Sequence, residues 1–313
     1  MSTLGTAWAL GHARRHGLVD VPGERRSHHV QTPRGGGVGI VFACLLALGL
    51  YAAVHVNWWL VAAGMLMVAG VGWLDDHRAL PVWPRLVVHV LSAALLAAAL
   101  YLGGAGTAAC LASFVLAVGL INAWNFMDGI NGLATSQALL CGLAFALLPG
   151  FAAPVLGLAI AGACLGFVPF NFPRAKVFLG DVGSGALGYL VAILVAIGFT
   201  SSPIHDWPLL LLAPLTMLVD SGLTLLWRVR RGDPWWQAHV EHAFQRWSHS
   251  KGHATVTLMY GLWTIIMIAV MLSVLGRPGN RGLVAFLVCM TAAMRGWFWL
   301  HRRYARQTEG LGS

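Results

Sequence analysis

Acidic side chains are scarce in this sequence, with only 11 Asp and Glu among 313 residues. Charged residues of both signs make up 10% of the chain, whereas soluble domains carry about 25%. An ordinary soluble domain is therefore excluded. Cysteines are also few, five in all, and follow no metal-binding spacing. We interpret them as small packing residues rather than as metal or redox ligands.

In place of charge the sequence has long apolar runs, and 58% of its residues are hydrophobic. A helix needs about 20 apolar residues to cross a bilayer, and continuous rather than alternating runs exclude a β-barrel. The sequence predicts one all-α polytopic membrane domain over residues 1–313, with about ten transmembrane helices. The predicted spans are 35–56, 58–74, 86–103, 107–122, 133–150, 151–170, 183–201, 207–227, 254–276 and 282–301.

The distribution of Lys and Arg predicts the orientation, because cytoplasmic loops are enriched in both residues. If residues 1–34 lie inside, 17 of the 20 Lys and Arg fall on the cytoplasmic side, and only Arg277 and Arg281 lie in outside loops. The net charge of +9 then reflects basic loops beside anionic lipid rather than a nucleic-acid partner. The cytoplasmic loops that matter below are 1–34, 75–85, 123–132, 171–182 and 228–253.

Four acidic residues lie beside apolar spans, in three loops that all face the cytoplasm under this assignment: Asp75 with Asp76, Asp128, and Asp181. An ionised side chain at the bilayer centre costs about 2.5–3.5 kcal/mol, so such acids usually mark function. The orientation rests on hydropathy and basic residues and not on these acids. Their coincidence on one face therefore predicts one composite cytoplasmic site.

The loop at 123–132 and the helix before it carry oxygen ligands. Asn122, Asn125 and Asp128 recur every three residues, which keeps them near one helical face. Amide and carboxylate oxygens suit Mg²⁺, which commonly binds one or two carboxylates together with substrate phosphates. A capping and turn motif is the structural alternative, just as the Asp75-Asp76 pair alone would fit a solvated helix end.

Two glycine-rich segments are candidate phosphate sites. Asp181 stands in the segment GDVGSG directly before a span, and a Gly-rich loop that opens a helix offers backbone N–H groups to a phosphate. Arg34 precedes three glycines at another membrane entry, where its guanidinium is placed to bind phosphate. The alternatives are a helix N-cap at Asp181 and a flexible basic linker around Arg34.

The longest soluble segment, 228–253, is dense in Arg and His. We interpret His239, His242 and Arg246 as an anion-binding group, whereas the arginines at 228–231 fit an ordinary positive-inside loop. A zinc site at the His pair is the alternative, although no third ligand follows at metal spacing.

Five motifs in order along the chain resemble the polyprenyl-phosphate N-acetylhexosamine-1-phosphate transferases, the membrane enzymes of glycosyltransferase family 4. The motifs are SHHVQTPRGGG, the Asp pair with Leu80-Pro81 and Arg85, NAWNFMDGINGLA, NFPRAKVFLGDVGSGALGY and HVEHAFQRW. The last is similar to the branch that starts O-antigen chains on UDP-activated deoxy-aminosugars. The triple-His motif typical of the muramyl-pentapeptide transferases is lacking.

The resemblance implies roles for the matching positions. It matches Asn125 and Asp181 to the ligands of Mg²⁺, with Mn²⁺ as an alternative ion, and the Asp pair to the catalytic residues. The expected site has the catalytic carboxylates Asp75, Asp76 and Asp128, the metal ligands Asn125 and Asp181, and the substrate-binding residues Arg34, Asn122, Asn131, Asn171, Phe178, His239, His242 and Arg246. Within it, Asn171 and Phe178 match uridine contacts, and the last three match the loop that holds the sugar nucleotide.

The chain departs from the family pattern at two places. The second Asp of the family's DGxDG stretch is Asn131 here, so a position assigned to nucleotide recognition keeps its hydrogen-bonding capacity and loses its charge. The family also begins with a complete span. Only about ten apolar-leaning residues precede Arg14, too few for a helix to cross a bilayer.

The reaction implied by the resemblance is attack of undecaprenyl phosphate on the β-phosphorus of a UDP-N-acetylaminosugar, with release of UMP, at the cytoplasmic face of a bacterial inner membrane. A phosphate monoester has its second pKa near 6, so the nucleophile is mostly dianionic at pH 7 and needs no strong general base. A homodimer is compatible with the resemblance.

Two other classes of function remain open from the residues alone. An ion-coupled transporter would use the acidic loops as an ion site, but the acids lie at one face rather than at the midplane, and the chain has no visible inverted repeat. A purely structural membrane scaffold leaves the Gly-Asp loops unexplained.

Overall fold

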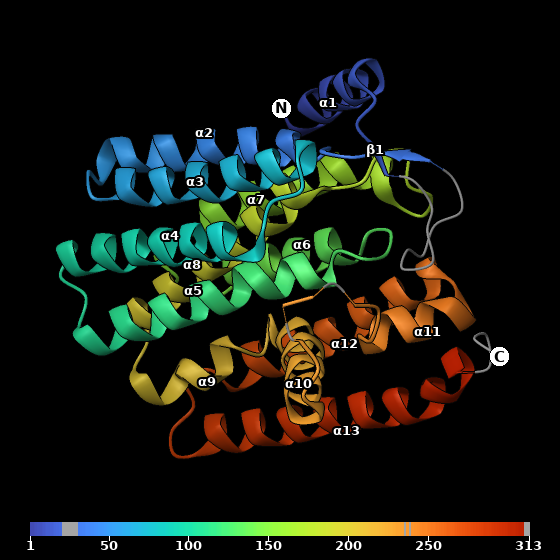
Figure 1. The fold of residues 1–313 in the computed structure, drawn as a ribbon. Coiled ribbons are helices and arrows are strands. Elements are labelled where there is room, and N and C mark those ends of the chain that lie inside the picture. The colour runs from blue at the N-terminus through green and yellow to red at the C-terminus, as the bar shows by residue number, and fades with distance from the viewer. Residues whose placement is uncertain (21–30, 235, 238, 310–313) are drawn as a thin grey trace.

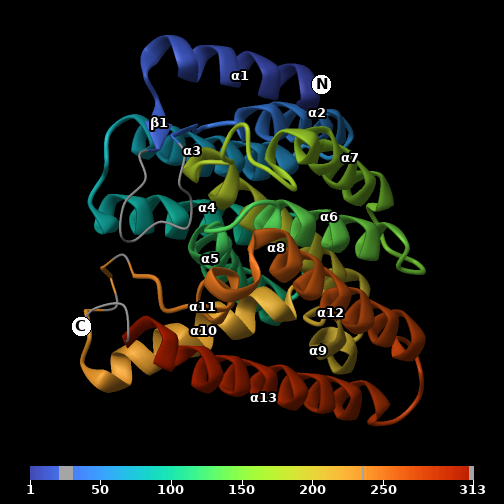
Figure 2. The same cartoon turned by 90° about the vertical axis from the view of Figure 1, so that its right-hand side faces the viewer.

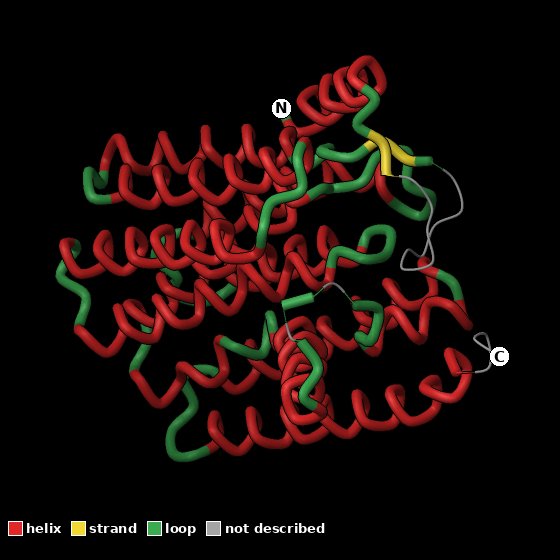
Figure 3. Tube along the Cα trace, in the orientation of Figure 1, coloured by secondary structure: helices red, strands yellow, loops and turns green. Residues whose placement is uncertain are grey.

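The computed structural model of the chain describes residues 1–20, 31–234, 236–237 and 239–309. Within these residues the protein is a bundle of helices with one two-stranded ribbon (Figures 1 and 3). The helices are α1 Ser2–His16, α2 Val38–Val54, α3 Trp58–His77, α4 Val82–Leu102, α5 Thr107–Met127, α6 Leu133–Ala146, α7 Pro154–Asn171, α8 Asp181–Ser201, η1 Ile204–Asp206, α9 Trp207–Leu210, α10 Leu215–Arg231, α11 Ala243–Lys251, α12 His253–Val274 and α13 Arg281–Glu309. The antiparallel strands are β1 Val19–Asp20 and β2 Thr32–Pro33.

The predicted all-α membrane fold is confirmed. Seven of the described helices are long and apolar enough to cross a membrane, namely α3, α4, α5, α7, α8, α12 and the part of α13 up to Tyr304. The predicted spans 35–56 and 133–150 form shorter helices, α2 with 17 residues and α6 with 14. At 1.5 Å per residue α6 is about 21 Å long, less than the ~30 Å hydrocarbon layer. The sequence overestimates both spans because apolar residues continue into the turns that end them.

The predicted span 207–227 is not one continuous helix. The segment Ile204–Leu210 and helix α10 form a pair bent by 81°. Pro214 stands directly before α10, and proline has no N–H with which to continue the preceding turn. Helix α10 therefore crosses the direction of the other helices (Figure 1).

Helix α8 lies at the centre of the bundle, and its apolar window is buried completely. Apart from Tyr189 and Phe199, its buried residues are small or aliphatic on every side, as expected for a helix enclosed by other helices. At Gly188 a Cβ atom would lie 2.4 Å from the carbonyl oxygen of Leu120 in α5, so this glycine lets two backbones touch. Helices α1 and α13 lie at opposite ends of the stack in both views (Figures 1 and 2).

The N-terminal segment forms α1, which has 15 residues and is not among the helices long enough to span a membrane. It is held to the bundle by side-chain hydrogen bonds. Thr3 Oγ1 donates to the carbonyl of Gly166 in α7 at 3.2 Å, and Thr6 Oγ1 donates to that of Gly36 at 3.3 Å. Residues 27–30 of the motif SHHVQTPRGGG lie outside the described residues.

Candidate active site

The C-terminal ends of α3 and α5 and the N-terminal end of α8 meet around one cavity. Its volume is about 210 Å³, and three of the four predicted acids line it, Asp76, Asp128 and Asp181. The other predicted site residues in its lining are Arg34, Asn131, Asn171 and Phe178. Residues from four of the predicted cytoplasmic loops therefore converge here.

Asp75 is not part of this lining, but Arg85 connects it to Asp181, which is. The Nη1 atom of Arg85 lies 3.0 Å from Asp75 Oδ2 and 2.8 Å from Asp181 Oδ2. The other carboxylate oxygen of Asp75 accepts a hydrogen bond from the N–H of Leu80 at 2.6 Å. The Asp pair, Leu80 and Arg85 thus form one connected unit, which explains why these residue types stand together in the sequence.

The side chain of Asp76, from the last turn of α3, binds the N-terminus of α8. Its two carboxylate oxygens accept hydrogen bonds from the N–H groups of Asp181 at 3.1 Å and Val182 at 3.2 Å, and its side chain is only 5% exposed. The next two N–H groups of α8 donate to the carbonyl of Gly180. The interpretation of GDVGSG as a phosphate loop is therefore wrong, because a carboxylate of the protein already binds this helix terminus.

The glycines of the two predicted phosphate loops permit close backbone packing. Gly36 and Gly37 donate backbone hydrogen bonds to Phe178 and Leu179 at 2.9 and 2.8 Å, and a Cβ atom at Gly37 would lie 2.3 Å from the Cα atom of Gly183. Only residues without side chains allow this approach. The glycine runs therefore dock one loop onto the other.

The two asparagines of α5 point to different surroundings. Asn125 Nδ2 donates to Ser184 Oγ at 3.2 Å, and Ser184 lies about one helical turn beyond Asp181. Asn122 is engaged deeper in the bundle, where Oδ1 is hydrogen-bonded to His89 at 3.3 Å and Nδ2 donates to the carbonyl of Val118 at 2.7 Å. Neither Asn122 nor Asn125 lines the cavity, whereas Asp128 does, so the three-residue spacing does not bring the three side chains to one place.

Asn171 ties together the loops on either side of the cavity. Its Oδ1 accepts from the N–H of Gly132 at 2.7 Å and its Nδ2 donates to the carbonyl of Val177 at 3.0 Å. Asn131 Nδ2 in turn donates to the carbonyl of Pro173 at 3.1 Å. Both polar atoms of the Asn171 amide are thus engaged with backbone, which gives this residue a role in loop shape that the sequence did not predict.

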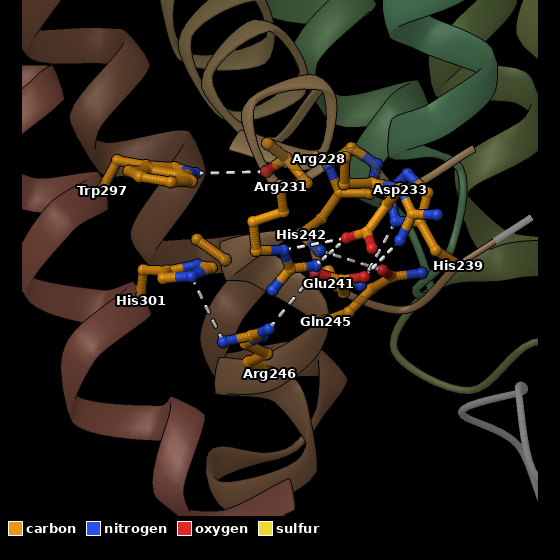
Figure 4. A network of polar contacts seen from close by, with 12 residues as sticks. Arg228, Arg231, Asp233, His239, Glu241, His242, Gln245, Arg246, Trp297 and His301 are labelled. Carbon is orange, nitrogen blue, oxygen red and sulfur yellow. Dashed lines mark hydrogen bonds and ion pairs between the residues drawn. The ribbon is translucent and has the colours of Figure 1, made fainter. Parts of the chain in front are cut away.

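The basic residues of loop 228–253 form a network of their own around Glu241 (Figure 4). Arg228 pairs with this carboxylate, Arg231 lies 2.5 Å from it and Arg246 lies 3.7 Å from it. None of the predicted anion-binding residues His239, His242 and Arg246 lines the cavity. Glu241, an acid of the same loop, is instead the partner of the three arginines. The spacing of residues in the sequence could not show this pairing.

The two predicted histidines of this loop stack on each other, with ring centroids 4.9 Å apart. Burial, followed by the neighbouring His242 and Arg228, lowers the pKa of His239 to about 4. This imidazole is therefore neutral at pH 7 and offers no positive charge to an anion. His242 is 3% exposed and precedes α11 as its N-cap residue.

Asp220 is a buried acid that was not predicted from the sequence as a site residue. Its carboxylate accepts hydrogen bonds from the N–H groups of Ala243 and Phe244 at 2.9 and 3.1 Å, from the Tyr260 hydroxyl at 2.6 Å and from Trp297 Nε1 at 3.2 Å. It thereby joins α10, α11, α12 and α13. The available signal was an acid within a predicted span, the same reasoning that drew attention to the other acids.

Helix α11 presents two further unpredicted residues to the cavity, Gln245 and His249, and His253 at the start of α12 joins them. Asp20 of β1 also lines the cavity. The N-terminus of α11, anchored by Asp220, is one turn or less from Gln245. The loop 228–253 thus reaches the acidic loops as the sequence predicted, but through different side chains.

Comparison with known proteins places this arrangement in a family. Residues 58–199, which run from α3 to α8 and include the predicted acids, match glycosyl transferase family 4. The decaprenyl-phosphate N-acetylglucosaminephosphotransferase of Mycolicibacterium smegmatis is 30% identical over 92% of this chain and 83% of its own length. This chain belongs to glycosyl transferase family 4.

Other proteins similar to this chain are named as related phosphosugar transferases. The decaprenyl-phosphate N-acetylglucosaminephosphotransferase of Mycobacterium tuberculosis is 31% identical over 82% of this chain and 75% of its own length. The probable undecaprenyl-phosphate N-acetylglucosaminyl 1-phosphate transferase of Bacillus subtilis is 31% identical over 59% of this chain and 57% of its own length. The resemblance predicted from the five motifs is confirmed at the level of the family.

More carboxylates than basic side chains line the cavity of this protein. Four carboxylates line it, those of Asp20, Asp76, Asp128 and Asp181, and Arg34 is the one Arg or Lys among its described lining residues. This donor set fits a divalent cation that prefers oxygen, such as Mg²⁺. No group of three His, Cys, Asp or Glu in the described part of the chain is arranged to hold a metal, so a bound ion needs amide, water or phosphate oxygens as well.

The pKa of the Asp128 carboxyl group in this cavity can be tested. Burial raises its pKa to about 7, and the negative charge of Asp76 adds to the effect. An acid whose pKa equals the pH is half protonated, and a bound cation favours its ionised form. We therefore expect Mg²⁺ binding at pH 7 to release about half a proton more per chain in the wild type than in Asp128→Asn.

The measurement is calorimetric titration of Mg²⁺ in two buffers of different ionisation enthalpy. At pH 8.5 Asp128 is mostly ionised before binding, so the difference between the two proteins should nearly vanish. Equal proton release from the two proteins at pH 7 would contradict the raised pKa.

Proposed function

We propose that this protein transfers an N-acetylaminosugar-1-phosphate from a UDP-sugar to undecaprenyl phosphate and releases UMP. The proposal rests on one observation above all. Asp76, Asp128 and Asp181, from three loops far apart in the sequence, line a single cavity in a chain that belongs to a family of phosphosugar transferases. The transporter alternative has no comparable support.

The acceptor phosphate supplies the nucleophile in this proposal. One of its oxygens forms a bond to the β-phosphorus of the UDP-sugar, and the bond from that phosphorus to the bridging oxygen of UMP breaks. Because the acceptor monoester is mostly dianionic at pH 7, no residue has to act as a strong general base. The chain must instead hold two anions together and neutralise the charge on the leaving UMP.

We assign Mg²⁺ to Asp181 and Asn125. When bound, the ion neutralises negative charge on the donor diphosphate. The surplus of carboxylates in the cavity supports Asp181. Asn125 is included because its side chain is hydrogen-bonded to Ser184 in the first turn of α8, the helix that begins at Asp181. Arg85 holds Asp181 from one side at 2.8 Å and so orients the carboxylate that would bind the ion.

The remaining residues bind and orient the substrates in this proposal. Arg34 is the cation of the cavity lining and is proposed to attract the acceptor phosphate. Asp75, through its ion pair with Arg85, is a positioning residue, and Asp128 is proposed to complete the acidic lining. Gln245 and His249 replace the predicted His239, His242 and Arg246 as our candidates for contact with the sugar nucleotide.

The finer features of the function are also proposals. The excess of basic residues in the loops supports a cavity that faces the cytoplasm, and we propose the inner membrane of a bacterium as its location. On the motif HVEHAFQRW we propose that the lipid-linked product starts an O-antigen or a similar glycan. A homodimer is proposed on the resemblance alone.

Incubation of membranes that contain the protein with a radiolabelled UDP-sugar, undecaprenyl phosphate and Mg²⁺ tests the proposal. The expected products are a labelled lipid and unlabelled UMP, and a panel of UDP-N-acetyl sugars identifies the donor. Membranes without the protein are the control. Metal-dependent ion flux without a lipid product from any donor would favour the transporter instead.

A further inference from the structure

Helix α13 has a long face that the rest of the bundle leaves open. Only 11% of its apolar window is buried. One side of the helix forms a shallow hollow lined by Arg295, Phe298, Trp299, Arg302 and Arg303. The spacing of three, four, seven and eight residues from the first arginine places all five on one helical face.

The three arginines of this hollow, Arg295, Arg302 and Arg303, have no acidic partner among the described side chains. They are exposed, and none forms an ion pair with a carboxylate among the described side chains. Arg295 also lies inside a helix that qualifies as a membrane span, where an unpaired cation is unfavourable. The guanidinium of Arg303 lies over the ring of Trp299, 5.5 Å from its centroid. This face therefore carries three cations without a carboxylate to pair with them among the described residues.

An apolar groove of about 320 Å³ adjoins the arginine hollow, and Trp299 belongs to both. The groove lies between α10, α12 and α13. Small residues of α13, Ala292, Ala293 and Gly296, leave space for it, and Trp263 and Ile266 of α12 contribute apolar surface. An anion site thus continues directly into a site for a hydrocarbon chain.

We propose that this face binds one anionic phospholipid of the surrounding bilayer. Its phosphate is held by Arg295, Arg302 and Arg303, and an acyl chain lies in the groove. Arginine binds phosphate through several N–H donors in a fixed geometry, and its long stem lets the charge reach the interface. The groove and the acid cavity share no lining residue, so this site is separate from the one where the proposed acceptor lipid must react.

Spin-labelled lipids test the proposal on the purified full chain in phosphatidylcholine vesicles. We expect the wild type to immobilise labelled phosphatidylglycerol at one site with at least about fivefold preference over labelled phosphatidylcholine, because one basic residue near the surface contributes roughly that factor. The triple variant Arg295→Gln, Arg302→Gln, Arg303→Gln should lose the preference. The corresponding triple Lys variant keeps the charge and should retain most of it.

Matched variants separate this site from a general effect of charge or packing. The double variant Arg277→Gln, Arg281→Gln removes basic residues near the opposite end of α13 and should preserve the preference. A Cβ atom at Gly296 would meet open space within 4 Å, so Gly296→Leu should fill the groove without a clash and reduce immobilisation of both labelled lipids. Gly119→Leu, at an equally open position on α5, should not.

Three results would overturn the proposal. One is equal immobilisation of the two lipids by the wild type, and another is equal loss in the Arg277, Arg281 variant and the triple Gln variant. The third is displacement of the labelled phosphatidylglycerol by stoichiometric undecaprenyl phosphate or by inorganic phosphate. The former displacement would make the face an acceptor site, and the latter would make it a site for free phosphate.

Discussion

Asp181→Ala is expected to abolish turnover, with a loss of roughly a thousandfold or more in kcat/KM, while the protein stays folded and inserted in the membrane. The carboxylate of Asp181 lines the acid cavity, and we assign the divalent cation to it. Its removal leaves the donor diphosphate without the group that we propose binds its counter-ion.

The fold should survive this substitution for a specific reason. Asp181 contributes its backbone N–H, not its side chain, to the hydrogen bond with Asp76 that joins α3 to α8, and alanine keeps that N–H. Arg85 loses one carboxylate partner and retains Asp75 at 3.0 Å. Loss of activity in this variant therefore reports on chemistry rather than on assembly.

The measurement is formation of labelled lipid from the donor identified for the wild type, together with extraction of the variant from membranes and its size-exclusion profile. Asp233→Ala is the matched control, because Asp233 is an acid paired with Arg231 and lies outside the cavity lining. It should retain near wild-type turnover. Near-normal Mg²⁺-dependent activity in Asp181→Ala would remove the basis for the metal assignment.

Asp220→Ala is expected to have the second large effect, on stability and on donor binding together. The substitution leaves the N–H groups of Ala243 and Phe244, the Tyr260 hydroxyl and the Trp297 indole without their common acceptor. A buried donor that loses its partner costs about 1–3 kcal/mol. We expect a loss of on the order of 3–5 kcal/mol in the free energy of unfolding, since neighbouring groups and water replace part of what is lost.

Donor binding should weaken because Asp220 anchors the first turn of α11, which carries Gln245 and His249 into the cavity. We expect KM for the UDP-sugar to rise roughly tenfold or more, as a small displacement of positioning groups is costly. Thermal unfolding in detergent and steady-state kinetics measure the two effects.

Two conservative variants calibrate this result. Asp220→Asn retains one acceptor oxygen and should fall between the wild type and Asp220→Ala in both readouts. Tyr260→Phe removes a single donor and leaves the bonds to α11, so its KM should stay near the wild-type value. An unchanged KM in an Asp220→Ala protein of lowered stability would restrict Asp220 to a structural role.

Features that depend on local sequence were predicted well. Each predicted span contains a helix, because an apolar run of sufficient length is helical in a membrane whatever surrounds it. The same holds for the convergence of Asp76, Asp128 and Asp181, which follows from the alternation of spans. The family also follows from the order of five motifs, and the relatives confirm it.

The functions of individual side chains could not be predicted in the same way. Asn122 and Asn125 are three residues apart, yet one is engaged with His89 and the other with Ser184. Arg246 has the charge expected of an anion-binding residue, but Glu241 from the same loop lies 3.7 Å from it. In each case the partner decides the role, and the sequence does not show which partner is near.

The sequence by itself determined seven of the ten predicted membrane-spanning helices, the excess of basic residues in alternate loops and the meeting of three acidic segments. The cost of burying charge and backbone in hydrocarbon acts on each segment separately. Only the tertiary structure decided that Asp76 binds the N-terminus of α8, 105 residues away, and that Asp220 anchors α11. Such contacts depend on the bend at Pro214 and on glycines that let distant backbones touch. They are properties of the packed bundle and not of any segment within it.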